Sequence, residues 1–226
     1  MSAHVLDRPV WSALTTRQAT FAVGGDHARR FAPDIGPLAA ARDDDPDSLA
    51  ALAALVPLDG TLLLLQADPI VVPPGLVAVT TAAGVQMVAE QFAPAPLDER
   101  IAPLTEADAG EMLALATLTK PGPFAARTPS LGEFWGMKER GVLVAMAGER
   151  MKHAGFTEVS GVCTHPSVRG RGLGRILSTA VAARIVARGE TPYLHAYATN
   201  TVAIQLYESL GFRLRRAMNV AVVARR

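Results

Sequence analysis

The sequence predicts a mixed α/β protein in which helices follow the central strands. Short apolar runs of strand length recur along the chain, each bounded by Pro, Gly or charged residues. Ala- and Leu-rich segments of helix length stand between them, and Gly189 and Gly211 follow two of these segments as helix stops. This alternation of strands and helices is typical of α/β proteins.

Composition narrows the class of protein. The chain has 226 residues, half of them apolar, which allows one large domain or two halves. A net charge of +1 argues against a general nucleic-acid binder. The single cysteine, Cys163, favours a reducing compartment, and no secretory signal or membrane span is evident. We therefore expect a cytoplasmic protein that binds neither nucleic acid nor membrane; the oligomeric state cannot be predicted.

The N-terminal part reads as short α and β segments. Asp45 and Pro46 are typical of a helix start, and Pro57 ends that helix. Pro94 and Pro96 predict a domain boundary within 92–97, which separates an N-terminal α/β region (1–98) from a second domain (99–226). The predicted helices are 10–17 and 49–56, and the predicted strands are 20–23, 61–66, 76–79 and 85–90.

The second part begins with an N-cap at Thr105, with Asp108 as a variant capping box. Prolines predict an irregular loop over 119–129, and 147–150 reads as a hairpin turn. The predicted helices are 105–118, 131–139, 173–188 and 201–210, and the predicted strands are 142–147, 151–154, 158–164, 192–198 and 218–223.

A glycine-rich basic loop lies between an apolar strand and an Ala-rich helix. Gly170, Gly172 and Gly174 let the backbone approach an anion, and the helix that opens at Leu173 offers free N–H groups. The arginines that add charged donors are Arg169, Arg171 and Arg175. The loop lacks the Lys-Ser/Thr of a Walker A loop and the spacing of a dinucleotide fingerprint. We interpret it as a phosphate site, with an unliganded basic turn as the alternative.

Two motifs resemble the GNAT superfamily of N-acetyltransferases. Residues 159–174 are similar to its acetyl-CoA motif, Arg/Gln-x-x-Gly-x-Gly/Ala, at Arg169, Gly172 and Gly174. Asn200, Ala203, Tyr207 and Gly211-Phe212 resemble its Asn-x-x-Ala-x-x-x-Tyr-x-x-x-Gly-Phe pattern. The resemblance is specific from about residue 140 onward. It implies a GNAT fold for 99–226, and one interpretation of 1–98 is a degenerate half of the same fold.

The resemblance implies direct transfer of acetyl from acetyl-CoA to a primary amine, without a metal. It assigns the main chain of Val162, Cys163 and Thr164 to the pantetheine arm. Asn200 caps its helix and is expected to bind the cofactor as well. Tyr207 lies two turns farther on nearly the same face and is expected to donate a proton to the CoA thiolate, with simple packing as the alternative.

Glu158 is the first candidate for the base that deprotonates the amine, directly or through water. Glu149, His153 and His165 are weaker candidates, and His165 is expected mainly to order the loop. His195 lies in a strand, where we expect a packed, hydrogen-bonded role. Cys163 is expected to be a small buried hydrophobe rather than a nucleophile.

The acceptor, a small-molecule or peptide amine, is expected between the 119–127 loop and the 131–138 segment. Phe124, Phe134 and Trp135 are candidate walls, and a core role for each is the equally favoured alternative. A non-catalytic acyl-CoA sensor and a nucleotide-phosphate binder of another fold are the competing hypotheses.

Overall fold

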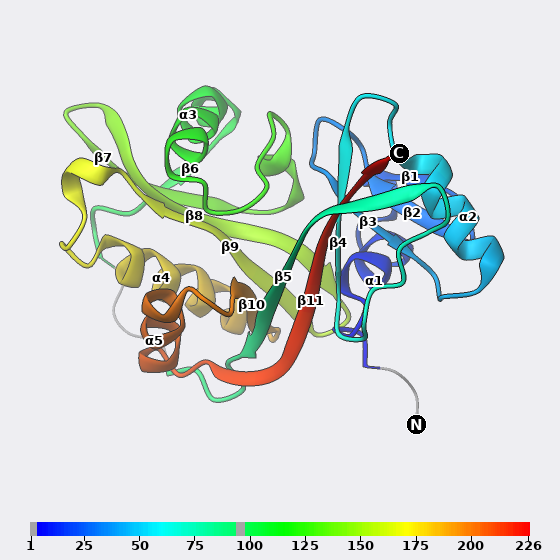
Figure 1. The fold of residues 1–226 in the computed structure, drawn as a ribbon. Helices are drawn as coiled ribbons and strands as arrows, with labels where there is room; N and C mark the ends of the chain where they lie inside the picture. Colours follow the sequence, from blue (N-terminus) through cyan, green and yellow to red (C-terminus); the bar gives the residue numbers. More distant parts are fainter. Residues whose placement is uncertain (1–3, 94–97) are drawn as a thin grey trace.

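In residues 4–93 and 98–226, which the computed structural model describes, eleven strands form one mixed, curled sheet (Figure 1). The predicted mixed α/β class is confirmed. The strand order is β1-β2-β3-β4-β11-β5-β10-β9-β8-β7-β6. The strands are β1 (Ala22–Gly24), β2 (Ala28–Phe31), β3 (Leu38–Ala41), β4 (Thr61–Gln66), β5 (Leu76–Val88), β6 (Ala102–Leu104), β7 (Phe134–Glu139), β8 (Val142–His153), β9 (Phe156–Thr164), β10 (Thr191–Tyr197) and β11 (Arg213–Arg225).

Helices cover both faces of the half of the sheet that holds β7, β8 and β9. In Figure 1, α4 and α5 lie on one side of these strands and α3 on the other, while α1 and α2 pack on the half with β1–β4. The helices are α1 (Pro9–Thr15), α2 (Pro46–Leu55), α3 (Ala109–Thr119), α4 (Leu173–Ala187) and α5 (Thr201–Ser209), with 3-10 turns η1 (Ala19–Phe21), η2 (Glu106–Asp108), η3 (Thr128–Leu131) and η4 (Pro166–Val168). No helix in the described ranges has the length and apolarity that a bilayer crossing would need.

Neighbouring side chains of β8 serve two cores, and a register shift against β7 at Val144 changes which positions face each core. Val144 and Ala147 pack toward α4, whereas Leu143 and Met146 pack toward α3. Because neighbouring side chains of a strand point to opposite faces, a nearly continuous apolar run marks a strand that is buried on both sides. β8 and β9 are therefore buried central strands, and the glycine-rich loop ahead of α4 follows β9.

Several predicted starts and stops are confirmed. Pro46 occupies the first turn of α2, and Thr105 forms a capping box with Asp108 ahead of α3. α4 ends just before Gly189, and α5 ends before Gly211. These signals are local in the chain, so a single sequence reveals them.

The helix predicted over 131–139 is wrong, because this segment forms η3 and β7. β7 pairs with β8 on one side and with β6 on the other. Gly148 and Gly161 leave room for the Phe134 ring, where added Cβ atoms would collide with it. Pairing between two strands and this tight packing override the helical pattern.

Three strand predictions also need correction. β8 runs unbroken through the turn predicted at 147–150, and the chain reverses only between His153 and Phe156. The strands predicted at 76–79 and 85–90 are one strand, β5, because β11 pairs along almost its whole length. The final strand begins at Arg213, five residues before the predicted start, and β2, β3 and β6 were not predicted.

The sheet passes from one half of the chain to the other without a break. β5, from the first half, lies between β10 and β11 from the second. The boundary predicted within 92–97 falls largely on residues 94–97, which lie outside the described residues, and stays a prediction. The architecture nevertheless places β4 beside β11 of the C-terminal part, with β3 next to β4.

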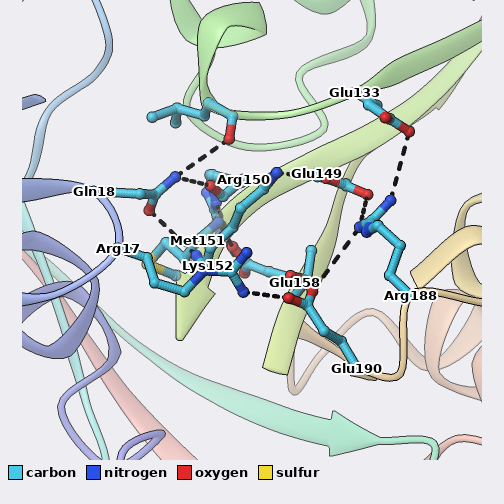
Figure 2. Close-up of polar contacts among 12 residues, drawn as sticks. Arg17, Gln18, Glu133, Glu149, Arg150, Met151, Lys152, Glu158, Arg188 and Glu190 are labelled. Carbon is cyan, nitrogen blue, oxygen red and sulfur yellow. Dashed lines mark hydrogen bonds and ion pairs between the residues drawn. The ribbon is translucent and has the colours of Figure 1, made fainter. Parts of the chain in front are cut away.

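A buried polar cluster ties the N-terminal segment to β8. Gln18 donates from Nε2 to the carbonyl of Arg150 at 2.7 Å and accepts from the N–H of Lys152 at 3.2 Å (Figure 2). His153 is fully buried, with Nδ1 3.0 Å from Ser12 Oγ and Nε2 2.7 Å from Tyr193 Oη. Burial lowers the pKa of His153 to about 4, so this imidazole is neutral in the folded protein.

Acid is therefore expected to weaken the fold between about pH 6.5 and about pH 4. An unfolded histidine has a pKa near ~6.5, so the unfolded chain binds the proton first as pH falls. The stability contributed by neutral His153 is complete above that range and lost through it, by about 2 kcal/mol between pH 7 and pH 5. Urea unfolding at both pH values should show this loss in the native protein and a smaller one in His153→Gln. Equal losses in the two proteins would contradict the assignment.

Candidate functional site

Strands β9 and β10, in the middle of the sheet, are hydrogen-bonded to each other over only part of their length. They pair in parallel only through Phe156, Thr157 and Glu158 of β9. β10 then stays with β5 up to Tyr197, and β9 stays with β8 up to Thr164. The edge of β9 from residue 159 onward thus faces β10 without pairing to it, and such an edge can take an extended ligand as an added strand.

A cavity of about 650 Å³ occupies this gap. All three predicted pantetheine-binding residues, Val162, Cys163 and Thr164, line it. Asn200 and Tyr207 from the second motif line it as well, and so does Arg169 at the start of the basic loop. The structure therefore brings the two motifs to one cavity.

The loop ahead of α4 has the backbone that its glycines predict. Gly170 and Gly172 have φ of 78° and 74°, a region that other residues rarely adopt, and Gly172 is the N-cap of α4. A Cβ at either position would meet no protein atom within 4 Å, so the space beside both is open. Leu173 is buried in the core and can offer only its main-chain N–H, as can Gly174. The first N–H groups of a helix have no intrahelical acceptor and can bind an anion.

The three arginines of the loop differ in their surroundings. Arg169 is exposed and lines the cavity. Arg171 forms an ion pair with Glu139 at 2.7 Å, and Arg175 donates to Ser209 Oγ at 2.6 Å. Arg169 is thus the arginine that the geometry places on the cavity wall, whereas Arg171 and Arg175 lie beside the helix start.

Asn200 and Tyr207 occupy the start and the buried face of α5. Asn200 Oδ1 accepts from the N–H of Ala203 at 3.2 Å, so it caps the helix as predicted while lining the cavity. Tyr207 packs edge-on against Phe212, with ring centroids 5.9 Å apart. Burial raises the pKa of Tyr207 to about 12, so the hydroxyl stays protonated at neutral pH and can donate a hydrogen bond.

Glu158 is fully buried, and both of its carboxylate oxygens have hydrogen-bond partners. Arg150 donates to both of its oxygens, from Nε at 2.8 Å and Nη2 at 2.7 Å (Figure 2). The N–H of Met151 donates to it at 3.2 Å, and His195 Nδ1 lies 2.7 Å from Oε1. Arg150 and Met151 lie opposite Glu158 in a β-bulge of β8, which explains why this N–H is free to bond a side chain.

These partners, Arg150 first, hold the pKa of the Glu158 carboxyl far below its usual range despite the opposing effect of burial. A carboxylate that binds protons so weakly is a poor base. Glu158 is not on the cavity wall, although Arg150 and His195 are. The geometry thus places the carboxylate behind His195 and Arg150 rather than on the cavity wall.

His195 has the packed, hydrogen-bonded role expected of it. Gln86 Nε2 lies 2.9 Å from His195 Nε2 and donates to the carbonyl of Leu6 at 2.9 Å. Arg215 donates to Gln86 Oε1 at 2.7 Å, which fixes the amide with its NH₂ group toward the imidazole. His195 Nε2 is therefore the acceptor in this pair, and Nδ1 carries the proton that Glu158 receives as a hydrogen bond.

The remaining candidate bases and the candidate nucleophile have structural roles. Glu149 is buried and forms ion pairs with Arg188 and with Lys152 (Figure 2). His165 accepts from the N–H of Ser167 at 3.2 Å and so orders the loop. Burial raises the pKa of the Cys163 thiol to about 11, which disfavours the thiolate that a nucleophile needs.

The predicted acceptor walls are only partly right. Thr119–Gly122 line the cavity, but Phe124, Phe134 and Trp135 do not. Phe124 and Phe134 stack edge-on in the core under α3, and Trp135 lies beneath Arg184, with 3.5 Å from guanidinium to ring. The opposite wall was not predicted and comes from β3, β4, β5 and β11. It depends on strand order, which no local motif encodes.

Replacing Glu158 with glutamine is expected to destabilise the fold strongly. Arg150 would keep its charge in a buried site and lose its partner, which typically costs about 3–5 kcal/mol. Urea unfolding at pH 7 measures this loss, with Glu99→Gln, at an exposed position, as the matched control. Equal stability of the two variants would argue that Glu158 is not held as described.

The chain is similar to a known protein family and to solved structures. A family model described as FR47-like protein matches residues 135–221. A solved structure from Novosphingobium aromaticivorans, assigned to the GNAT family of acetyltransferases, is 46% identical over 99% of this chain and 100% of its own, with a TM-score of 0.94. None of the curated proteins matches the sequence.

Two more distant structures share the fold. A GCN5-related N-acetyltransferase from Kribbella flavida is 16% identical over 99% of this chain and 96% of its own, with a TM-score of 0.69. A GCN5-related N-acetyltransferase-like protein from Streptococcus suis is 15% identical over 96% and 92%, with a TM-score of 0.59. Both cover nearly the whole chain, including the part before residue 98.

Proposed function

Because the chain belongs to the GNAT family of acetyltransferases, we propose that it transfers an acetyl group from acetyl-CoA directly to a primary amine. The observation that carries the proposal is the continuous cavity from Arg169, beside the open N-terminus of α4, along the unpaired edge of β9 to Tyr207. This course suits a ligand with a diphosphate at one end, an amide-bearing arm in the middle and a thioester at the other.

Main-chain groups bind most of the cofactor in this proposal. The N–H groups of residues 170–175 and the Arg169 side chain hold the diphosphate, since both are suited to phosphate oxygens. The edge of β9 at Val162, Cys163 and Thr164 pairs with the amides of the arm. Asn200 has its amide NH₂ group left over from helix capping for a further hydrogen bond.

In the chemical step the amine nitrogen bonds to the acetyl carbon, and the carbon–sulfur bond breaks. The ammonium must first lose a proton, and the sulfur must finally gain one. Tyr207 donates a hydrogen bond to the sulfur as negative charge develops, because a phenol with a pKa of about 12 yields its proton to a thiolate only at a cost. Solvent supplies the final proton.

Glu158, predicted as the base, does not take a proton from the amine in this proposal. It holds His195 and Arg150 in place on the cavity wall. The proton of the ammonium leaves to solvent in the cavity. No metal takes part, and a cytoplasmic location remains a prediction.

The test is release of free CoA thiol from acetyl-CoA over a panel of amines, with mass spectrometry of the products. Acetylated amine in amounts equal to the released thiol is the expected result. Stoichiometric CoA binding without thiol release across the panel would instead favour the acyl-CoA sensor. Thermal stabilisation by a nucleotide but not by CoA would favour a nucleotide-phosphate binder.

A further inference from the structure

One part of the cavity lies beyond the cofactor groove. In the strand order, β3, β4 and β11 lie on the far side of β5 and β10 from β9, and Figure 1 shows β3 and β4 in the opposite half of the sheet from α4. We call this part the acceptor arm. Its wall residues are Leu38, Leu63, Leu65, Met218, Val220 and Arg150.

The acceptor arm is apolar except at one end. Five of its six wall residues are aliphatic or Met, and Arg150 is the charged one. Arg150 uses Nε and Nη2 for Glu158, so Nη1 is left over, and the side chain is 11% exposed. A guanidinium with spare donors beside an apolar wall is suited to an oxygen anion.

The cavity offers no acidic side chain to a ligand in the described residues. Its charged lining residues are Lys120, Arg150 and Arg169, all cationic. Two acidic residues that lie behind this wall already form ion pairs, Glu158 with Arg150 and Asp7 with Arg215. Arg169 belongs to the diphosphate end, and Glu158 neutralises Arg150. Lys120, an exposed residue of the cavity lining, is the positive charge that remains for an acceptor.

We propose that the acceptor arm binds an amine with an apolar body and one carboxylate, that is, an apolar α-amino acid. This rests on the proposed acetyl transfer. The carboxylate faces Arg150 and Lys120, and the side chain contacts the wall formed by β3, β4 and β11. A second ammonium on the acceptor would lie in apolar surroundings near Lys120, and none of the described residues on the cavity wall is an acid that could be its counter-ion, which is strongly unfavourable.

An acyl chain longer than acetyl is the other apolar group that this arm could receive. The polar end argues against it, because a hydrocarbon tail would cover the spare donors of Arg150 without bonding them. A preference for octanoyl-CoA over acetyl-CoA, with the same amine, would therefore overturn the proposal.

The test compares kcat/KM of the full chain, at saturating acetyl-CoA, for L-leucine, L-leucinamide, 3-methylbutylamine and 1,5-diaminopentane. The kcat/KM for L-leucine is expected to exceed that for 3-methylbutylamine by at least about tenfold, which corresponds to the free energy of one charge-assisted hydrogen bond. It is expected to exceed the kcat/KM for the diamine by a larger factor. A diamine equal to or better than leucine would overturn the proposal. An equal kcat/KM for leucinamide and leucine would show that the site does not recognise a carboxylate, and would indicate a peptide amino terminus as the acceptor.

The amines of this panel also differ in basicity, which affects kcat/KM by itself. A charged side chain introduced in the wall tests the electrostatic preference separately, because it leaves the amines unchanged. Leu63, half-buried on β4, is changed to Glu, with Leu63→Gln as the neutral control of the same shape. The leucine-to-diamine ratio of kcat/KM is expected to fall at least tenfold in Leu63→Glu relative to Leu63→Gln. An unchanged ratio would show that acceptors do not enter the acceptor arm. Absence of thiol release with every amine would count against the proposed function rather than against this assignment.

Discussion

Gly172→Val is expected to weaken acetyl-CoA binding by about 100-fold while the protein stays folded. Gly172 is the N-cap of α4, and a side chain there would project into open space rather than into protein. That space is where the proposed site holds the diphosphate. Loss of one or two charge-assisted hydrogen bonds, at about 1.5–3 kcal/mol each, gives this magnitude.

Backbone strain must be separated from loss of the binding site. Gly189, at the other end of α4, has φ of 77° and equally open surroundings, so Gly189→Val carries similar strain away from the cavity. Titration calorimetry should show near-native affinity for acetyl-CoA in Gly189→Val and the large loss in Gly172→Val. Similar affinities in both variants would remove the loop as the phosphate site.

Tyr207→Phe is expected to lower kcat by about 10²–10³-fold, the usual effect of removing one donor to developing charge. The ring is buried against Phe212, so phenylalanine fits the same space and the fold should be unaffected. Affinity for acetyl-CoA should change by less than about threefold, because the hydroxyl acts only when charge builds on sulfur. Single-turnover kinetics with a saturating amine measures the step directly.

The pH profile gives an independent check on Tyr207. With a pKa of about 12, this hydroxyl remains protonated throughout the range in which the enzyme can be assayed. Tyr207 therefore contributes no alkaline fall in kcat below about pH 11. A fall near pH 9 that disappears in Tyr207→Phe would show that the pKa is lower and that the phenol transfers its proton outright.

The motif-bearing part of the site was predictable because its signals are local. Gly170, Gly172 and Asn200 are required by backbone conformation and helix capping within a few residues of each position. Tyr207 follows Asn200 by two helical turns, so the helix alone places both on the cavity. Local stereochemistry is the same wherever the segment lies in the fold.

The rest of the site depends on contacts between distant segments. Leu63 reaches the cavity because β4 pairs with β11, which pairs in turn with β5. The sequence predicts a turn at Arg150, yet this residue lies in a bulge of an unbroken strand and binds Glu158, the base predicted from the sequence. Neither outcome follows from neighbouring residues, since strand order and register are set by the whole core.

The same reasoning explains the error at residues 131–139. The Leu131–Lys138 segment has apolar residues at helical spacing. In the structure, however, the Phe134 ring packs on the sheet in the space that Gly148 and Gly161 leave open. The glycines that make room for it lie 14 and 27 residues away in the chain. A pattern read within one segment cannot include them, and tertiary packing decided between helix and strand.

The most direct test of the account is a crystal structure of the full chain with CoA. The diphosphate is expected within hydrogen-bond distance of the N–H groups of residues 170–175, with the arm along the edge of β9 at residues 162–164. The sulfur should lie within reach of the Tyr207 hydroxyl. CoA bound outside the cavity between β9 and β10, or with its sulfur directed away from Tyr207, would contradict the proposed acetyl transfer.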